Sequence, residues 1–214
     1  MSLGLVLLMA GTSSRMGCDK RMLPWQGSSL GNFVLDLWQA ALPKGHKILV
    51  LPEEDPLAAY ALALGYKVVY NHQPQEGQAS SIRLGLASLL QERVVDLEGI
   101  IFSVGDQPLL DVDTIRCLIG AFKEAYVKDD KAILRPSYEP GGQGGNPVIF
   151  SAQWAEELAS LRGDQGGRTL LQGAAKNHLV SVSIPSYHGW SRGFDVDTPE
   201  AYEKVYRTWG QENH

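Results

Sequence analysis

Short apolar runs alternate with longer segments whose apolar residues recur at helical spacing along most of this chain. The runs with the length and composition of buried strands are residues 3–9, 47–51, 66–70 and 99–104. The segments with the helical period are residues 33–42, 57–62, 82–90 and 115–126. Because each strand is followed by a helix, the pattern predicts a mostly parallel sheet with helices on both faces.

The last third of the chain is less regular, but its pattern continues the same alternation. Strands are predicted at residues 132–136, 146–150 and 179–184, and helices at residues 152–161 and 202–209. A glycine-dense loop at residues 140–145 interrupts this region. Because no repeat or low-complexity linker divides the sequence, we expect one α/β domain that spans residues 1–214.

Composition limits the class of function. The chain has 214 residues, of which 44% are hydrophobic and 20% are charged, and its formal net charge is -5. This negative charge gives no electrostatic reason to expect a nucleic-acid partner. No apolar run has the length of a membrane span and no export signal is visible, so no membrane partner is expected and a cytoplasmic location is predicted.

The cysteines and histidines do not indicate a metal centre. Cys18 and Cys117 are the two cysteines, and they suggest neither a disulfide framework nor a set of metal ligands. Cys117 lies among Ile115, Leu118 and Ile119 and is predicted to be a small core residue. The five histidines form no pair at zinc-binding spacing, so zinc is not expected.

A loop rich in glycine and serine follows the first predicted strand. Residues 8–20 read LMAGTSSRMGCDK, in which small residues let backbone N–H groups line a nest for anions and Arg15 and Lys20 add positive charge. The loop lacks both the ending of a Walker A motif and the spacing of a dinucleotide fingerprint. It favours a nucleoside triphosphate, and the alternative is an ordinary turn with solvated basic residues.

Carboxylates follow two predicted extended segments. Asp106 comes directly after the strand at residues 99–104, which holds it at the ligand-binding edge of the sheet. Asp195 and Asp197 alternate, so an extended backbone would direct both to one face. Carboxylate oxygens are preferred ligands of Mg²⁺. The alternatives are a turn role for Asp106 and a helix cap at Asp197 or Thr198.

Two further polar loops are candidates for substrate contacts. Residues 77–83 read GQASSIR, and their amides and hydroxyls suit a base edge or a ribose, unless they form a serine-capped helix with an exposed arginine. Residues 163–168 read GDQGGR and would face a second substrate or join two helices. The loops after Met9, Tyr70 and Val104 are all expected at the carboxyl edge of the sheet, where ligands gather in such folds.

These segments also carry a resemblance to a known family. In chain order they are LMAGTSSRMGCDK, GQASSIR, GDQPLL, GGNPVIF, GDQGGRTLL and FDVDTPE. Each segment alone is weak evidence for a family, but six in this order across almost the whole chain are highly specific to one superfamily. The chain resembles the molybdenum cofactor cytidylyltransferases, a branch of the nucleotidyltransferase superfamily.

The resemblance implies both a fold and a reaction. The fold is a Rossmann-like three-layer α/β sandwich with a mostly parallel mixed sheet. The reaction transfers CMP from CTP, or a nucleotidyl group from another nucleoside triphosphate, to the terminal phosphate of molybdopterin with Mg²⁺ and releases pyrophosphate. Residues 1–110 would then form the nucleotide-binding part and residues 111–214 the acceptor-binding part. An apo molybdenum hydroxylase would be a further partner.

The resemblance also implies roles for individual residues. The catalytic residues would be Arg15, Lys20 and Asp106. The nucleotide would be bound by Ala10, Gly11, Thr12, Ser13, Ser14, Arg15, Lys20, Gly77, Gln78, Ala79, Ser80, Ser81 and Asp106. Mg²⁺ would be held by Asp106 and Asp197, with Asp195 as the third candidate ligand. The acceptor would be bound by Asn146, Asp164 and Arg168.

The first loop and the segment after it depart from the usual pattern of the family. This chain has Met9 where the family usually has alanine, and Ala10 where guanine-specific relatives usually have glycine, which favours cytosine. Residues 27–30 read GSSL in place of the usual Gly-Lys-Pro-Leu, which predicts a different start for the first helix.

Two alternative functions stay open at the level of the sequence. The acceptor could be another phosphate, such as a sugar or alcohol phosphate. A non-catalytic carrier of the molybdenum cofactor would belong to a different class of protein. Arg15, Lys20, Asp106 and Asp197 favour an enzyme, because a passive carrier has no need of groups that bind a metal and a triphosphate.

Overall fold

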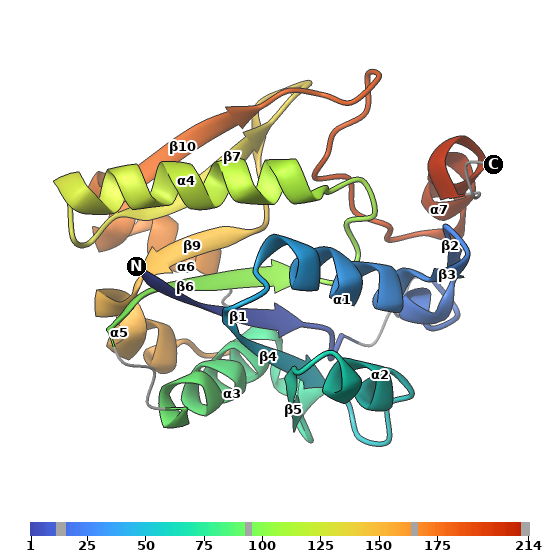
Figure 1. The fold of residues 1–214 in the computed structure, drawn as a ribbon, viewed down its shortest axis with the longest axis horizontal. Coiled ribbons are helices and arrows are strands. Elements are labelled where there is room, and N and C mark those ends of the chain that lie inside the picture. Colours follow the sequence, from blue (N-terminus) through green and yellow to red (C-terminus); the bar gives the residue numbers. More distant parts are fainter. Residues whose placement is uncertain (12–15, 93–95, 164–166, 211–214) are drawn as a thin grey trace.

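The computed structural model describes residues 1–11, 16–92, 96–163 and 167–210. Within these ranges the chain forms an eight-stranded sheet with helices on both faces (Figure 1). The spatial order of the strands is β10 (Leu179–Ile184), β7 (Ile133–Tyr138), β9 (Val148–Ser151), β6 (Leu97–Val104), β1 (Ser2–Leu8), β4 (His46–Leu51) and β5 (Lys67–Tyr70). The short strand β8 (Gln143–Gly144) pairs with β7.

The sheet is mixed but mostly parallel. Parallel pairing joins β1 to both β4 and β6, β4 to β5, and β10 to β7. β9 runs antiparallel to β6 and β7, and β8 runs antiparallel to β7. The register places Leu8 of β1 beside Val104 of β6, so these two strands end at the same edge. The α/β fold with a mostly parallel mixed sheet that the sequence predicts is therefore confirmed.

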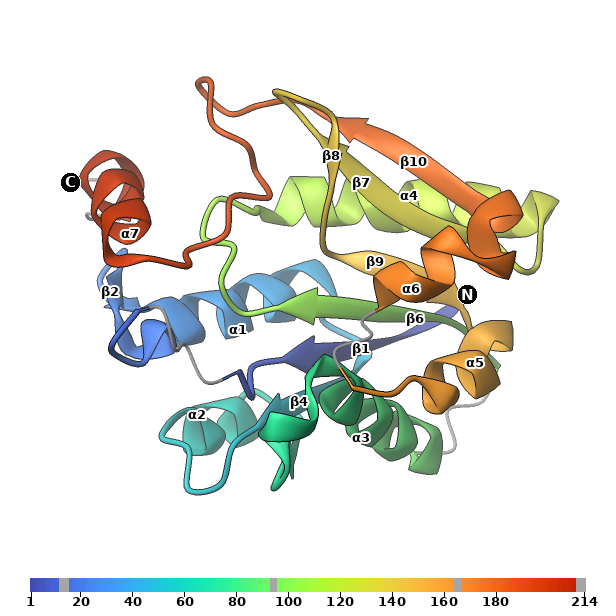
Figure 2. The same cartoon turned by 180° about the vertical axis from the view of Figure 1, so that it is seen from behind.

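Two helical layers cover the sheet. One face carries α1 (Leu30–Ala41), α2 (Leu57–Ala63) and α4 (Val112–Lys128), and the other carries α3 (Gln78–Gln91), α5 (Ala155–Ser160) and α6 (Gly167–Gln172), as Figure 2 shows from behind. The 3-10 segments are η1 (Lys20–Met22), η2 (Pro74–Glu76), η3 (Ala152–Trp154) and η4 (Ala174–His178). Across the described ranges, no helix combines the length and apolar character that a membrane span requires.

The C-terminal helix packs away from the two main layers. α7 (Pro199–Val205) continues into a π-helical turn at Tyr206–Gly210, beside the hairpin of β2 (Pro24–Trp25) and β3 (Ser28–Ser29) (Figure 1). The backbone N–H of Gln26 in this hairpin donates to the carbonyl oxygen of Gly210 at 2.7 Å. Contacts of this kind hold the turn at Tyr206–Gly210 against the hairpin that precedes the first helix.

The central strand β1 explains why both layers are present. Leu5 and Leu7 belong to the apolar cluster that includes α1 and α4, whereas Val6 belongs to the cluster that includes α3. All three side chains are 0% exposed. Successive side chains of a strand point to opposite faces, so a continuous apolar run is typical of a strand covered on both sides.

Two details differ from the prediction. Cys117 is exposed on α4 rather than buried, because Ile115, Leu118 and Ile119 occupy the inner face of a helix that turns about 100° per residue. Helix α3 begins at Gln78, so the segment expected as a polar loop forms the first turn of this helix. This turn therefore has fixed helical geometry at the edge of the sheet.

The unusual start of the first helix has a clear structural outcome. The hydroxyl of Ser29 accepts a hydrogen bond from the backbone N–H of Asn32 at 3.2 Å and caps α1. A serine cap satisfies one of the N–H groups that have no partner within the helix. The segment at residues 27–30 therefore supplies the N-terminal cap of α1 through Ser29.

We predict that Leu5→Ala lowers the free energy of unfolding by about 2–5 kcal/mol, because it leaves a cavity in a fully packed core. The measurement is urea denaturation followed by circular dichroism. Leu62→Ala is the matched control, since Leu62 on α2 is 57% exposed and should change stability by less than about 0.5 kcal/mol. Equal losses for the two variants would contradict the assigned core.

Candidate active site

A pocket of about 330 Å³ lies at the carboxyl edge of the sheet. Its walls come from the end of β1, from η1, from the first turn of α3, from the end of β6 and from the segment before α7. The predicted site residues that line it are Ala10, Gly11, Lys20, Gly77, Gln78, Ser81, Asp106 and Asp197. Segments from both ends of the chain therefore meet in one pocket.

The Lys20 side chain joins two carboxylates in this pocket. Its ammonium group donates to Asp106 Oδ2 at 2.6 Å and to Asp197 Oδ1 at 3.1 Å. It also donates to the backbone carbonyl oxygen of Val196 at 3.1 Å. Burial of the ammonium opposes its charged form, but Asp106 and Asp197 outweigh this effect and raise the pKa of Lys20 above its usual value. Lys20 therefore stays positive at neutral pH.

Backbone hydrogen bonds fix the positions of Asp106 and Asp197. Asp106 follows β6, and its carbonyl oxygen accepts a hydrogen bond from the N–H of Val196 at 2.9 Å. This contact attaches the extended segment that carries Asp197 to the end of a central strand. On the other side of Asp197, the Thr198 hydroxyl accepts from the N–H of Ala201 at 3.2 Å and caps α7. Asp197 is thus fixed between a strand end and a capped helix.

The oxygen atoms in the pocket suit a divalent cation. Asp106 Oδ1 is buried and has no hydrogen-bond partner among the described residues, although the other oxygen of this carboxylate contacts Lys20. A buried carboxylate oxygen without a partner is costly unless a ligand satisfies it. No group of three or more His, Cys, Asp or Glu side chains that could hold a metal occurs in the part of the chain that the structure describes. Two carboxylates would need waters or substrate oxygens to complete a shell, as Mg²⁺ commonly does.

Asp195 has a different partner from Asp197. Its Oδ1 accepts a hydrogen bond from Gln107 Nε2 at 3.0 Å, and Gln107 is only 2% exposed. Loss of water around the carboxyl group, together with the charge of Asp106, raises the pKa of Asp195 to about 6 even though the residue keeps contact with solvent. Asp197 lines the pocket and Asp195 does not, so the structure separates the two alternating carboxylates by their contacts.

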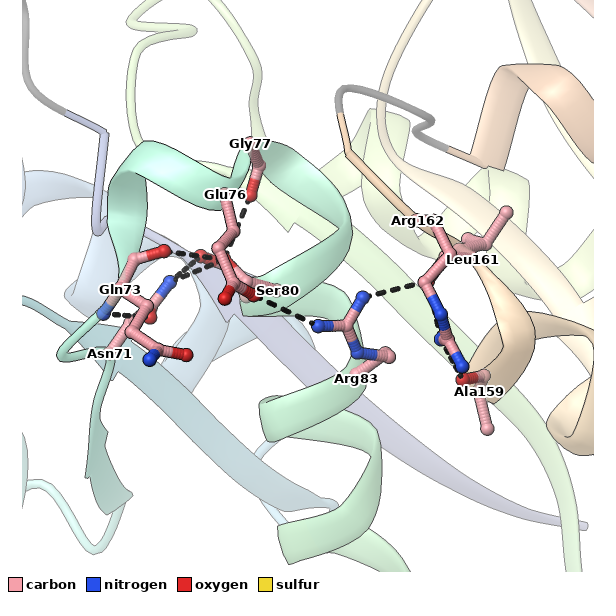
Figure 3. A network of polar contacts seen from close by, with 10 residues as sticks. Asn71, Gln73, Glu76, Gly77, Ser80, Arg83, Ala159, Leu161 and Arg162 are labelled. Carbon is pink, nitrogen blue, oxygen red and sulfur yellow. Dashed lines mark hydrogen bonds and ion pairs between the residues drawn. The ribbon is translucent and has the colours of Figure 1, made fainter.

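The first turn of α3 is held by a residue that the sequence analysis did not single out. Asn71 follows β5, is 5% exposed, and donates from Nδ2 to the hydroxyls of Ser80 and Ser81 at 2.9 and 2.8 Å (Figure 3). The Ser80 hydroxyl donates to the carbonyl oxygen of Gly77 at 2.8 Å. Gly77 precedes the helix at a φ of 83°, a conformation that favours glycine, and no side chain caps the helix. The alternative of a serine cap is therefore wrong.

Arg83 connects α3 to the segment that follows α5. Its guanidinium donates to the carbonyl oxygen of Leu161 at 2.7 Å and to Glu76 Oε2 at 3.3 Å (Figure 3). The backbone N–H of Ala79 donates to the carbonyl oxygen of Gly163 at 3.2 Å. The start of the GDQGGR segment therefore lies against the first turn of α3, which lines the pocket.

A buried arginine, Arg21, holds the end of the first strand. Arg21 is 8% exposed, and it donates to the carbonyl oxygen of Met9 at 2.8 Å. Its charge is balanced by Asp19 at 2.6 Å and by Asp55 at 2.5 Å. Arg21 lines the pocket but is engaged by two carboxylates, so it serves to position the backbone at Met9.

The remaining predicted site residues have separate outcomes. Outside the described residues lie Thr12, Ser13, Ser14, Arg15 and Asp164, together with the side chain of Arg168. Ala79 is 0% exposed and Ser80 is 7% exposed, and neither lines the pocket. Asn146 lines a neighbouring cavity, and its carbonyl oxygen accepts a hydrogen bond from the hydroxyl of Tyr138 at 2.5 Å.

The chain matches the model of the MobA-like NTP transferase domain over residues 5–180. It belongs to this family. Because it belongs to the MobA-like NTP transferase family, the chain is a nucleotidyltransferase, and the arrangement of the pocket agrees with this. The match covers the second half of β1 and the loop that carries Lys20, as well as β6 and Asp106.

Individual relatives cover nearly the whole transferase. The purine catabolism protein PucB from Bacillus subtilis (strain 168) is 26% identical over 211 residues, which are 94% of this chain and 95% of PucB. The structure of Rv0371c from Mycobacterium tuberculosis H37Rv is 28% identical with a TM-score of 0.73, and 97% of this chain and 99% of that chain are covered. Rv0371c in complex with manganese is 26% identical with a TM-score of 0.71, with 97% and 100% covered.

A more distant structure shares the fold alone. The molybdopterin-guanine dinucleotide biosynthesis protein A from Archaeoglobus fulgidus is 16% identical to the transferase, with a TM-score of 0.61. The alignment covers 97% of each chain. The architecture is therefore retained where most side chains have changed.

We predict that Asn71→Ala lowers the free energy of unfolding by about 1–3 kcal/mol, because two buried hydroxyls lose a donor and the N–H of Gln73 loses its acceptor. Urea denaturation provides the measurement. The control is Asn177→Ala, an exposed position in η4 for which little change is expected. A stable Asn71→Ala protein would show that the first turn of α3 does not depend on this amide.

Proposed function

We propose that this nucleotidyltransferase moves CMP from CTP to the terminal phosphate of molybdopterin and releases pyrophosphate. The observation that carries the proposal is the contact of the Lys20 ammonium with Asp106 and Asp197 in a pocket at the carboxyl edge of the sheet. Ala10 in the first loop supports cytosine, and the six ordered sequence segments support molybdopterin as the acceptor.

The chemistry needs positioning and charge more than proton transfer. An oxygen of the acceptor phosphate attacks the α-phosphorus of CTP, and the bond from that phosphorus to the oxygen bridging to the β-phosphate breaks. The bonding electron pair leaves with pyrophosphate. Because the acceptor phosphate is already ionised at neutral pH, no side chain has to remove a proton. The protein must bring two anions together and stabilise the charge on the departing group.

The residues of the pocket supply these requirements in the proposal. Asp106 and Asp197 would hold a divalent cation, with Asp195 nearby as a further carboxylate. The cation would supply positive charge to the phosphate oxygens. This assignment is supported by the buried Asp106 Oδ1 that has no partner among the described residues, and by the manganese complex of Rv0371c. Lys20 keeps a fixed positive charge in the same pocket, and Arg15 would contact the triphosphate from the preceding loop.

Other residues would bind the two substrates. Ala10 and Gly11 would surround the nucleotide together with Gly77, Gln78 and Ser81, which line the same pocket. Thr12, Ser13 and Ser14 complete the proposed nucleotide set, whereas the buried Ala79 and Ser80 would act only by supporting the first turn of α3. Asn146, Asp164 and Arg168 would face the acceptor. Residues 1–110 would thus bind mainly the nucleotide and residues 111–214 mainly the acceptor, whose product would pass to an apo molybdenum hydroxylase.

The direct test is pyrophosphate release by the purified chain with Mg²⁺, with CTP, GTP, ATP or UTP, and with molybdopterin present or absent. We expect release with CTP only when molybdopterin is present. Release with a sugar or alcohol phosphate in place of molybdopterin would assign a different acceptor. Binding of molybdopterin without release of pyrophosphate from any nucleotide would identify a carrier.

We predict that Lys20→Ala and Asp106→Ala each lower turnover by about 10²–10³-fold, because each removes a charged group that contacts the reacting phosphates or their cation. Steady-state pyrophosphate release is the measurement, and circular dichroism tests the fold. Lys67→Ala is the control, since this lysine lies on β5 and pairs with Glu92 outside the pocket. Wild-type turnover in the Lys20 and Asp106 variants would refute their roles.

A further inference from the structure

A second cavity of about 670 Å³ lies beside the proposed nucleotide pocket. Leu8 at the end of β1 and Gln78 in the first turn of α3 line both cavities. The second cavity continues over β6, β9 and β7 towards the loop that contains Asn146. A molecule bound there would therefore lie next to a nucleotide in the first pocket.

Arg135 is the one charged side chain among the described residues that line this cavity. It lies on β7, and its Nε is buried without a hydrogen-bond partner in the described part of the chain. This differs from Arg21 in the first pocket, which is balanced by two carboxylates. A guanidinium that loses water without gaining a partner is unfavourable, so a buried donor of this kind is suited to an anionic ligand.

The backbone of β8 holds the guanidinium in place. An ideal Cβ on Gly144 would lie 2.5 Å from both Cζ and Nε of Arg135. β8 pairs with β7 at Ser137 and Tyr138, so this close approach is part of the sheet. Only a residue without a side chain leaves the guanidinium where it is. The close approach of β8 therefore limits where the half-buried Arg135 side chain can lie.

The rest of the cavity wall is mixed, and the surface open to a ligand is more polar than apolar because the amide residues Gln78, Gln143 and Asn146 line it. Phe102 and Phe150 lie edge to face with ring centroids 6.0 Å apart, and they are 6% and 1% exposed. Ile82, Leu158 and Leu171 lie behind the wall on the helices α3, α5 and α6, and they are themselves buried. Such a wall suits a flat heterocycle, because amide side chains can hydrogen-bond the polar edge of a ring while apolar side chains lie behind it.

We propose that this cavity binds the acceptor as a flat heterocycle that carries an anionic group, and that Arg135 is the counter-ion of that group. The proposal rests on the proposed function, since molybdopterin is a phosphorylated pterin, and it adds a residue and a ligand chemistry to the acceptor side. A bidentate guanidinium matches the geometry of phosphate oxygens better than an ammonium group does. Arg135 therefore sets the affinity for the acceptor and leaves nucleotide binding to the first pocket.

The test compares the full chain with Arg135→Met, Arg135→Lys and Gly144→Ala in two assays. The first is equilibrium binding of molybdopterin measured by its fluorescence, and the second is pyrophosphate release with molybdopterin and CTP varied in turn. We expect Arg135→Met to weaken molybdopterin binding and to raise its KM by about 10-fold to 100-fold, with the KM of CTP unchanged. Arg135→Lys should recover part of this loss, because it keeps the charge but not the planar donors.

Gly144→Ala separates position from charge, because its Cβ displaces the guanidinium at an exposed strand without removing it. It should also weaken molybdopterin binding. Arg116→Met is the control, since this exposed arginine lies on α4 and donates to the carbonyl oxygen of Ala40 at 3.0 Å. It loses the same charge without touching the cavity, so molybdopterin binding should match the wild type.

The outcomes separate this inference from the proposed function. Turnover of CTP with an unchanged molybdopterin affinity in Arg135→Met would overturn the inference and leave the function standing. Binding of molybdopterin that depends on Arg135, with no pyrophosphate release from any nucleotide, would overturn the function and support the inference. A wild-type chain that neither binds molybdopterin nor releases pyrophosphate with it would overturn both.

Discussion

The site depends on the positively charged side chain of Lys20, which lies between two carboxylates from distant parts of the sequence. Asp106 and Asp197 lie close enough for the Lys20 ammonium to contact both, at 2.6 and 3.1 Å. Two carboxylates at such separation repel each other unless positive charge is present, and partial burial strengthens that repulsion. Lys20 is therefore needed by the folded pocket before any substrate binds. A divalent cation at the same oxygens would add to a positive charge that the protein already carries.

The first turn of α3 is the structural element that the two cavities share. Gln78 lines both of them, and its neighbours are held from two sides. Asn71 fixes the serine hydroxyls from the end of β5, and Arg83 attaches the helix to the carbonyl oxygen of Leu161. These contacts fix the first turn of α3 from both sides of the shared wall. A fixed wall would keep a nucleotide and an acceptor at a constant relative position, which favours a reaction between two bound substrates.

The sequence predicts the parts of this molecule that depend on local pattern, and it misses those that depend on distant partners. The sequence predicts β1 and the strand that precedes Asp106, because a strand buried on both faces is a continuous run of apolar residues. Asn71, Gln107 and Arg135 carry no such signal, since each acquires its environment from residues far along the chain. The prediction that Cys117 is a core residue is wrong for a local reason. Its apolar neighbours occupy the inner face of α4, so Cys117 lies on the outer face.

The distribution of cations gives this acidic chain two different ways to bind anions. In the first pocket, Lys20 and Arg21 each pair with two carboxylates, so these described groups carry an excess of negative charge that a divalent cation would offset. In the second cavity, Arg135 meets no carboxylate among the described lining residues and would attract an anion directly. A net charge of -5 gives little long-range attraction for a polyanion, so recognition has to come from these short-range contacts. The division follows the chemistry of the two proposed substrates, because a triphosphate brings its own metal and a phosphorylated ring does not.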